Sequence, residues 1–306
     1  MPETTEGAVK YLQEAIEGVS VVIPCKNEEA AIRPTVEQVR QHLEPTGMNY
    51  EIIVVNDGSS DSSGREALEA GAMVLVHRTN LGYGNAIMNG MSMAKYDVIA
   101  ILDADGTYPI AELPAMVEMA QGYDMVVGQR IWQEANTTFI SRVLRKLLAM
   151  LIYYFSSIKA PDFNSGFRVF HKLDILNYRP FLCPTFSFTT SQTLLFLLTH
   201  RSVFFKPIKY DIRIGKTKVS LVRDAFRTFS YVLLMTNLFQ PYRLSGVFLL
   251  VGLLGNLLVW LGALALGWSG GTQLALHLGV SLSVICAMLA LVIMPLTKII
   301  LRVFKS

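Results

Sequence analysis

Short apolar runs alternate with longer segments of helical periodicity between residues 19 and 130. The apolar runs are nearly continuous, as in Ile52-Ile53-Val54-Val55, which is typical of strands buried on both faces of a sheet. The alternation predicts an α/β domain in which helices cover both faces of a mostly parallel, Rossmann-like sheet. The predicted strands are Val19–Pro24, Glu51–Asn56, Met73–His77, Val98–Asp103 and Met125–Gly128, and the predicted helices lie near Glu28–Leu43, Ser60–Ala70, Asn85–Ala94 and Ile110–Ala120.

The regular alternation ends after Gly128, and elements that bind a second substrate are expected there. The pattern predicts a helix near Ser141–Ser157, a loop at Ala160–Gly166, a helix near Phe188–His200 and a strand at Phe204–Arg213. The segment Val219–Leu238 carries apolar and basic residues at helical spacing, with Arg223 and Arg227 four positions apart. This spacing predicts an amphipathic helix that lies in a membrane interface.

No Asp, Glu, Lys or Arg occurs in the 54 residues from Leu244 to Thr297. Within them, Leu244–Leu266 and Leu274–Leu296 are each 23 residues long, enough to span a hydrocarbon core of about 30 Å. The positive-inside rule predicts a multi-pass protein of the cell (inner) membrane with its large domain in the cytoplasm, because the connector is uncharged and both outer ends are basic. The basic residues at those ends are Arg243, Lys298, Arg302 and Lys305. The alternative is a buried helical hairpin of a soluble protein, although core helices rarely lack charges over such a length.

The composition supports contact with lipid and argues against a nucleic-acid-binding or disulfide-rich protein. Of the 306 residues, 52% are hydrophobic, and a net charge of +3 is too small to indicate binding of nucleic acid. Nine Lys or Arg against two Asp between Arg201 and Arg243 suit anionic headgroups or phosphates, or form an ordinary solvated face. The three cysteines predict no disulfide framework, and the acidic N-terminus predicts no signal peptide. The predicted parts are an N-terminal extension (1–18), the α/β domain (19–218), an amphipathic juxtamembrane segment (219–243), a transmembrane hairpin (244–297) and a basic tail (298–306).

Three predicted strands end in carboxylate or amide side chains. The first ends in Pro24-Cys25-Lys26-Asn27-Glu28, the second in Asn56-Asp57-Gly58-Ser59-Ser60-Asp61 and the fourth in Asp103-Ala104-Asp105-Gly106. Ligands of an open parallel sheet bind beyond the carboxyl ends of its strands, so these segments are candidates for one site. The segment after the second strand also suits a turn with a helix N-cap, and that interpretation stays open. Asp103 and Asp105 repel each other and need a cation, and their hard oxygen atoms indicate Mg²⁺ or Mn²⁺ bridged to a diphosphate.

The motifs and their order resemble those of the family 2 glycosyltransferases. The resemblance is carried by Val21-Val22-Ile23-Pro24 with Asn27-Glu28, Val55-Asn56-Asp57-Gly58-Ser59-Ser60-Asp61, Asn80-Leu81-Gly82-Tyr83-Gly84-Asn85-Ala86 and Asp103-Ala104-Asp105-Gly106. Val127-Gly128-Gln129-Arg130 and Asp162-Phe163-Asn164-Ser165-Gly166-Phe167-Arg168 are similar to motifs of the dolichyl- and polyprenyl-phosphate sugar synthases within that family. The resemblance covers about residues 19–220 and implies the A-type glycosyltransferase fold, a UDP- or GDP-linked sugar donor, a polyprenyl phosphate acceptor and inversion at the anomeric carbon.

The resemblance also implies roles for individual residues. Pro24, Asn27, Glu28, Asp57, Asp103 and Ala104 would line the nucleotide-sugar site, with Asp103 and Asp105 holding the metal and the diphosphate. Asp105, Asp162 and Arg130 would be catalytic, Asp162 by orienting the acceptor or the metal, because a lipid phosphate oxygen is already anionic and needs little deprotonation. The candidates for contact with the acceptor phosphate, or for its support, are Arg130, Arg142, Arg168, Lys216 and Lys218. Arg130, Arg142 and Arg145 also suit mere surface charge, and Thr217 stands where these synthases usually have serine.

Rival functions are less well matched. A processive polysaccharide synthase normally carries Gln-x-x-Arg-Trp, whereas this chain has Gln240-Pro241-Tyr242-Arg243-Leu244 and two predicted spans. A dinucleotide-binding oxidoreductase needs Gly-x-Gly-x-x-Gly after its first strand, and the near match at Gly82-Tyr83-Gly84 follows the third. Transfer to another lipid or polysaccharide acceptor remains an alternative, as does a non-catalytic membrane scaffold, and homo-oligomerisation is possible. The sequence leaves the sugar, the nucleotide and the lipid length open.

Overall fold

The structure is a computed structural model that describes residues 16–131, 139–210, 221–265, 274–276, 278–286 and 289. For residues 139–145, 221–227, 259 and 263–264 it describes the backbone alone. The chain divides into two compact units, Met1–Phe229 and Ser230–Ser306. The division falls within the predicted juxtamembrane segment.

The described part of the first unit is built on a seven-stranded sheet with the strand order β3-β2-β1-β4-β6-β5-β7. The strands are β1 (Gly18–Cys25), β2 (Asn49–Asn56), β3 (Met73–Val76), β4 (Val98–Ile101), β5 (Met125–Ile131), β6 (Arg168–His171) and β7 (Val203–Lys209). β1 pairs in parallel with both β2 and β4, with Cys25 opposite Asn56 and Val22 opposite Ile101. Three predicted strands therefore end at the same edge of the sheet, as their pattern requires.

Strand β6 departs from the predicted parallel arrangement. It pairs antiparallel with β4 on one side and with β5 on the other, so the sheet is mixed. The register sets Arg168 opposite Ile101 of β4 and opposite Val127 of β5. Because β6 runs in the opposite direction, the residues that precede it lie at the edge where β4 ends. The loop Ala160–Gly166, which leads into β6, therefore lies next to the Asp103 motif, which follows β4.

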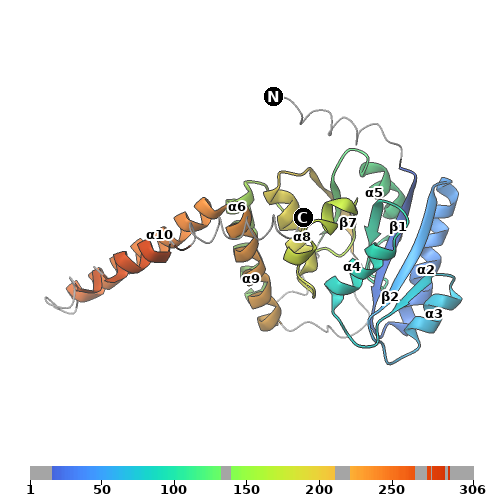
Figure 1. The fold of residues 1–306 in the computed structure, drawn as a ribbon, viewed down its shortest axis with the longest axis horizontal. Coiled ribbons are helices and arrows are strands. Elements are labelled where there is room, and N and C mark those ends of the chain that lie inside the picture. Colours follow the sequence, from blue (N-terminus) through green and yellow to red (C-terminus); the bar gives the residue numbers. More distant parts are fainter. Residues whose placement is uncertain are drawn as a thin grey trace. The chain divides into compact units, whose positions relative to one another are not determined.

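Helices cover both faces of the sheet, as predicted (Figure 1). The described helices up to residue 198 are α2 (Glu29–Leu43), α3 (Ser63–Glu69), α4 (Tyr83–Met93), α5 (Leu113–Met119), α6 (Phe139–Ser156), α7 (Leu173–Leu176) and α8 (Phe188–Leu198), with short 3₁₀ turns η1 (Glu44–Thr46), η2 (Ile110–Glu112) and η4 (Arg179–Phe181). Helix α6 packs against α8. Helices α2 and α5 share one buried cluster with the sheet, and α4 packs against β1 and β2 with α8 beside it. A Cβ at Gly90 of α4 would lie 2.5 Å from Val22 Cγ1, so glycine permits this close packing.

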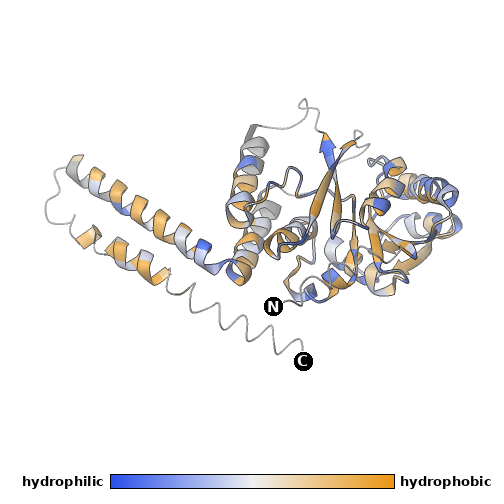
Figure 2. Ribbon diagram, turned by 90° about the horizontal axis from the view of Figure 1, so that it is seen from above, coloured by the Kyte–Doolittle hydropathy of each residue, from blue (hydrophilic) through white to orange (hydrophobic). Residues whose placement is uncertain are grey.

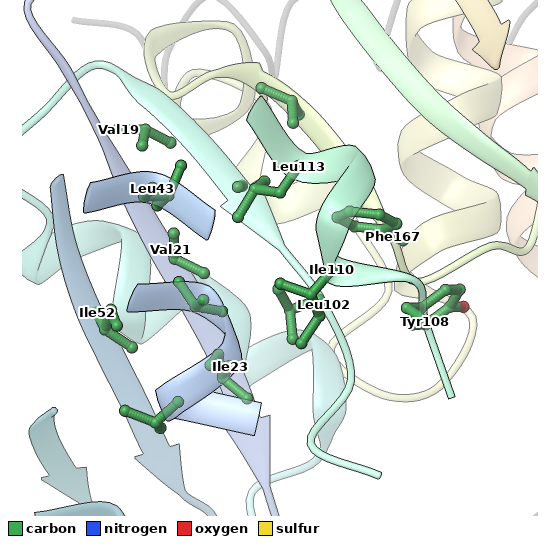
Figure 3. Close-up of a cluster of buried hydrophobic side chains, with 14 of the residues drawn as sticks. Val19, Val21, Ile23, Leu43, Ile52, Leu102, Tyr108, Ile110, Leu113 and Phe167 are labelled. Carbon is green, nitrogen blue, oxygen red and sulfur yellow. The ribbon is translucent and has the colours of Figure 1, made fainter. Parts of the chain in front are cut away.

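The main hydrophobic core lies between the sheet and helices α2 and α5 (Figure 3). Val19, Val21 and Ile23 alternate along β1 and are fully buried, which follows from the two-residue period of a strand. Leu43 at the end of α2 and Leu113 at the start of α5 are also fully buried. At about 25 cal/mol per Å² of apolar surface, each such side chain contributes about 2 kcal/mol to folding. This core fixes the strands whose carboxyl ends carry the candidate site.

The second unit is helical where it is described. Its elements are the end of α9 (Leu221–Phe239) and the 25-residue helix α10 (Pro241–Ala265). Within α10, the 22 residues Pro241–Gly262 form one helix long and apolar enough to cross a membrane, and Figure 2 shows that most of the helix is coloured as hydrophobic. Leu250 and Leu258 are 58% and 68% exposed, as expected for side chains that face lipid. The second predicted span is described only at 274–276, 278–286 and 289, where it is helical.

Candidate active site

The loops that follow β1 and β2 hold each other through short polar contacts. Asn27 has a φ of 52°, a left-handed conformation that asparagine tolerates, and its Oδ1 accepts a hydrogen bond from Ser60 N at 2.8 Å. Ser59 Oγ accepts from Asn27 N at 3.0 Å, and Ser63 Oγ accepts from Glu28 N at 2.9 Å. The first and second motifs therefore form one surface at the carboxyl edge of the sheet, with Pro24 opposite Val55 at its base.

Asp57 is buried, 4% exposed, and its carboxylate is held from several directions. Oδ1 accepts a hydrogen bond from Leu81 N at 2.7 Å and lies 2.8 Å from Nδ1 of His77. Oδ2 accepts from Gly82 N at 2.9 Å, and the φ of 100° at Gly82 is one that favours glycine. Asp57 therefore fixes the loop that leads from β3 into α4, which explains why the Asn80-Leu81-Gly82-Tyr83 motif accompanies it.

Asp103 and Asp105 follow β4 at the same edge, with the buried Ala104 between them. Tyr83 Oη donates a hydrogen bond to Asp103 Oδ1 at 2.8 Å, and burial together with that carboxylate raises the pKa of Tyr83 well above its usual value. A Cβ at Gly166 would lie 2.8 Å from Asp103 Oδ2, so only glycine allows the loop before β6 to approach the carboxylate this closely. Asp105 Oδ1 accepts hydrogen bonds from Thr107 N at 3.2 Å and from Thr107 Oγ1 at 2.7 Å.

The carboxylates of Asp103 and Asp105 suit a divalent cation of the hard type. Among the described residues, no group of three or more His, Cys, Asp or Glu side chains converges on one point. Mg²⁺ is usually held by one or two carboxylates together with water and substrate phosphates, and it does not require a cage of protein ligands. Two carboxylates at the carboxyl edge of the sheet therefore fit an ion whose remaining ligands are diphosphate oxygens and water.

Asp162 and Arg130 form a buried, bidentate ion pair. Arg130 Nε donates to Asp162 Oδ2 at 2.8 Å, Arg130 Nη2 donates to Oδ1 at 2.9 Å, and the Arg130 backbone N donates to Oδ2 at 3.0 Å. The two side chains are 12% and 5% exposed. Burial alone would lower the pKa of Arg130, but the hydrogen bonds to Asp162 raise it, so the guanidinium stays charged. Its Cζ lies 5.4 Å from the ring centre of Tyr210.

Arg168 begins β6 and is fully buried. A side chain without exposed surface does not suit direct contact with an acceptor phosphate. Its Nη1 donates to Thr189 O at 3.0 Å, to Gln192 Oε1 at 3.2 Å and to Thr193 Oγ1 at 3.2 Å, and its Nε donates to Ser165 O at 3.0 Å. Burial lowers the pKa of Arg168 to about 10. Arg168 connects the loop before β6 to helix α8. These contacts favour a role in supporting the acceptor site over direct contact with the acceptor phosphate.

The remaining acceptor candidates lie outside what the structure describes. Arg142 lies in the first part of α6, residues 139–145, for which only the backbone is described, and Lys216 and Lys218 fall in residues 211–220. Several of the described candidates meet at one edge: Asp57 contacts Leu81, Asp103 contacts the nearby Tyr83, and Gly166 lies close to Asp103 in the segment that carries Asp162.

Comparison with known proteins identifies the family. Residues 20–183, more than half of the chain, match the model of glycosyl transferase family 2. The chain belongs to glycosyl transferase family 2. It is a glycosyltransferase by this membership, and the matched region contains all of the strand-end motifs together with Asp162 and Arg168.

Among curated proteins, the chain is similar to an undecaprenyl-phosphate 4-deoxy-4-formamido-L-arabinose transferase of Enterobacter sp. (strain 638). The two are 30% identical over 247 residues, which cover 77% of this chain and 72% of the relative. It is also similar to a low-salt glycan biosynthesis hexosyltransferase of Haloferax volcanii, 29% identical over 86% of this chain and 63% of the relative. These alignments extend past the end of the family match into the C-terminal half of the chain.

A solved structure confirms the A-type glycosyltransferase fold. Glucosyl-3-phosphoglycerate synthase of Mycobacterium tuberculosis, crystallised with Mn²⁺, UDP and glucosyl-3-phosphoglycerate, superposes with a TM-score of 0.57. The match covers 77% of this chain and 85% of that protein at 19% identity, so it supports the fold alone.

Sequence reasoning missed several residues that shape this family 2 site. Tyr83 lies inside a quoted motif, but its hydroxyl bond to Asp103 was not predicted. Tyr108 Oη accepts a hydrogen bond from Gly166 N at 2.7 Å, which locks the loop beneath Asp103. The sequence predicted His77 only as the last residue of a strand. Its proximity to Asp57 could have been inferred, because parallel pairing sets Val76 opposite Asn56 and therefore places His77 beside Asp57.

Proposed function

We propose that this protein transfers a sugar from a nucleotide-sugar donor to a polyprenyl phosphate, with inversion at the anomeric carbon, at the cytoplasmic face of a membrane. The observation that carries the proposal is the contact between the Asp103 carboxylate and Gly166. It brings the donor motif after β4 within reach of the loop that carries Asp162, whose carboxylate pairs with Arg130 of β5. The similarity to an undecaprenyl-phosphate sugar transferase over 77% of the chain supports the choice of acceptor.

The donor would lie along the edge formed by the loops after β1, β2 and β4. Asn27, Glu28 and Pro24 would lie on one side of the donor, and the buried Asp57 and Ala104 would lie beneath it. Asp103 and Asp105 would hold Mg²⁺ or Mn²⁺ against the diphosphate. When bound, such an ion offsets the negative charge that builds on the leaving nucleoside diphosphate, which stabilises the transition state more than the ground state.

The acceptor phosphate would approach from the side of Asp162 and Arg130. Its attacking oxygen is already anionic at neutral pH, so the reaction depends more on alignment than on removal of a proton. Asp162 holds the planar guanidinium of Arg130 in one orientation through two parallel hydrogen bonds. Arg130 would thereby present a fixed positive charge to the incoming phosphate, with Arg142, Lys216 and Lys218 as further candidates for drawing the lipid in.

The membrane would bring the lipid acceptor to this site. Helix α10 contains one described segment able to cross a bilayer, and the predicted second span would make the protein multi-pass. In the first unit, helix α6 exposes Leu147, Met150 and Tyr153, which are 55%, 65% and 51% accessible. An exposed apolar face of this kind suits a lipid surface better than water. We infer a bacterial-type inner membrane location with the catalytic domain in the cytoplasm.

The decisive experiment uses membranes that carry the full chain, undecaprenyl phosphate, and radiolabelled UDP- and GDP-sugars with Mg²⁺ or Mn²⁺. Transfer of label to the lipid phosphate is expected with one donor and is expected to stop after chelation of the metal. Asp105→Asn should insert into membranes normally and lose turnover, whereas Glu37→Gln, on an exposed position of α2, should retain it. Label on another lipid or on polysaccharide would replace the acceptor in this proposal, and no transfer from any donor would favour a scaffold.

A further inference from the structure

A buried histidine lies directly behind Asp57 in a chain of polar contacts. His77 follows β3 and is 8% exposed. Its Nδ1 lies 2.8 Å from Asp57 Oδ1, and its Nε2 lies 3.1 Å from Asn89 Nδ2 in helix α4. Asn89 Oδ1 in turn accepts a hydrogen bond from Arg179 Nη2 at 3.0 Å. The four side chains come from separate elements, β2, β3, α4 and η4, or from the residues that follow them.

The order of donors and acceptors fixes the proton on His77. The Arg179 guanidinium can only donate, so the oxygen of the Asn89 amide must face it and the NH₂ group must face His77. Because that NH₂ group also can only donate, Nε2 of His77 has to be the acceptor. The imidazole proton is therefore on Nδ1, where it is donated to Asp57, and the ring is neutral.

With this tautomer, three hydrogen bonds fix the orientation of the Asp57 carboxylate. The carboxylate accepts hydrogen bonds from His77 and from the backbone amides of Leu81 and Gly82. The next residue, Tyr83, donates to Asp103. The short segment Leu81–Tyr83 thus contacts two carboxylates of the donor edge, those of Asp57 and Asp103, and His77 determines how Asp57 meets that segment.

We propose that His77, kept in its neutral Nδ1–H form by Asn89 and Arg179, is a positioning residue for the donor nucleotide. It holds the Asp57 carboxylate in the orientation that binds the nucleotide and does not itself touch the reacting atoms. The proposal rests on the proposed function, in which Asp57 lines the nucleotide site. It predicts that loss of His77 weakens donor binding while the transfer step at saturating donor continues.

The tautomer is tested by ¹⁵N NMR of the full chain in detergent, labelled at its five histidines. His77→Gln identifies the His77 signals by their absence. The expected result at pH 7 is a neutral ring with its proton on Nδ1. Arg179→Gln, a change at an exposed residue, should alter those signals because the Asn89 amide is then free to turn. A ring protonated on Nε2 at pH 7, in either neutral or charged form, overturns the proposal.

The functional role is tested by titration of UDP and GDP, each with Mn²⁺, and by donor KM and kcat. His77→Leu should raise the nucleotide Kd and donor KM by about tenfold, the usual effect of losing one hydrogen bond to a charged group, with kcat changed less than about twofold. His77→Asn, whose amide NH₂ lies near the position of Nδ1, should restore most of the affinity. Arg65→Gln, at a side chain 68% exposed and outside this chain of contacts, should behave as wild type.

The outcomes distinguish the positioning role of His77 from the proposed donor site. If Asp57→Asn weakens nucleotide binding and a folded His77→Leu does not, the positioning role is wrong and the donor site stands. If Asp57→Asn leaves the binding of both nucleotides unchanged, the proposed donor site itself is wrong. Should His77→Leu fail to fold, Arg179→Gln takes its place, with an expected threefold or greater rise in donor KM, and an unchanged KM rejects the role.

Discussion

Replacement of Asp162 by Asn should destabilise the first unit as well as impair transfer. The change keeps the side-chain volume but removes the negative charge that three hydrogen bonds from Arg130 now satisfy. Removing one partner of a buried ion pair typically costs about 3–5 kcal/mol, because the other charge is left buried without compensation. Arg130 retains 12% exposure and Asn keeps one acceptor oxygen, so the lower value, about 3 kcal/mol, applies here.

This free energy converts into a measurable change in thermal unfolding. A domain of about 150–250 residues loses about 2–4 °C in Tm for each kcal/mol, so Asp162→Asn should lower Tm by about 6–12 °C. The double variant Arg130→Met with Asp162→Leu removes both charges and should recover a large part of that loss, since apolar replacements of a buried pair are often neutral. A double-mutant cycle of Tm values in detergent, with Arg130→Met and Asp162→Leu measured singly and together, therefore isolates the ion pair from other effects.

Two results would refute this reasoning. A Tm of Asp162→Asn within about 1 °C of wild type would show that the pair contributes little to folding, contrary to its burial. Full activity of the same variant with a flat pH profile would reject any essential role of Asp162 in transfer. Loss of activity in the double variant with a recovered Tm is the expected outcome, because it would separate the catalytic requirement for the Arg130–Asp162 pair from its structural one.

Two further predictions follow from individual contacts. Gly166→Ala places a Cβ 2.8 Å from Asp103 Oδ2 and should reduce turnover at least tenfold, whereas Gly122→Ala, with its nearest neighbour at 3.9 Å, should not; equal activities would contradict the close approach. The hydrogen bond that His171 donates to Asp97 raises the pKa of His171 above 6.5, so the stability that this pair contributes is complete below about pH 6.5 and is lost as the pH rises through the folded pKa. The Tm difference between wild type and His171→Gln should therefore be larger at pH 6 than at pH 9, and an equal difference at both would count against the pair.

The donor edge was predictable from sequence because it depends on local patterns. Near-continuous apolar runs identify buried strands, and the residues just after Cys25, Asn56 and Ile101 must then lie at one edge of a parallel sheet. No knowledge of side-chain packing is needed for that step. For this reason the placement of Asn27 and Asp57 agrees with the expectation even where their hydrogen-bond partners were not foreseen.

The acceptor side was less predictable because it depends on pairing between distant segments. Strand β6 has only four residues, Arg168–His171, and no alternation that separates it from a loop. Its antiparallel insertion between β4 and β5 is a property of the whole sheet and not of its own sequence. The burial of Arg168 follows from this insertion, so this candidate for contacting or supporting the acceptor phosphate joins the loop before β6 to α8.

A continuous series of contacts joins the nucleotide side of the site to the acceptor side. Asp57 holds the amides of Leu81 and Gly82, the adjacent Tyr83 holds Asp103, and Asp103 packs against Gly166 in the loop that begins with the ion pair of Asp162. Each link runs through backbone or through side chains that are largely buried, so the separation of the donor and acceptor carboxylates is set by the fold. A reaction between two anionic substrates gains little from a strong base and much from such fixed placement. The strongest selection in this site should therefore act on the residues that hold the carboxylates, and not on the carboxylates alone.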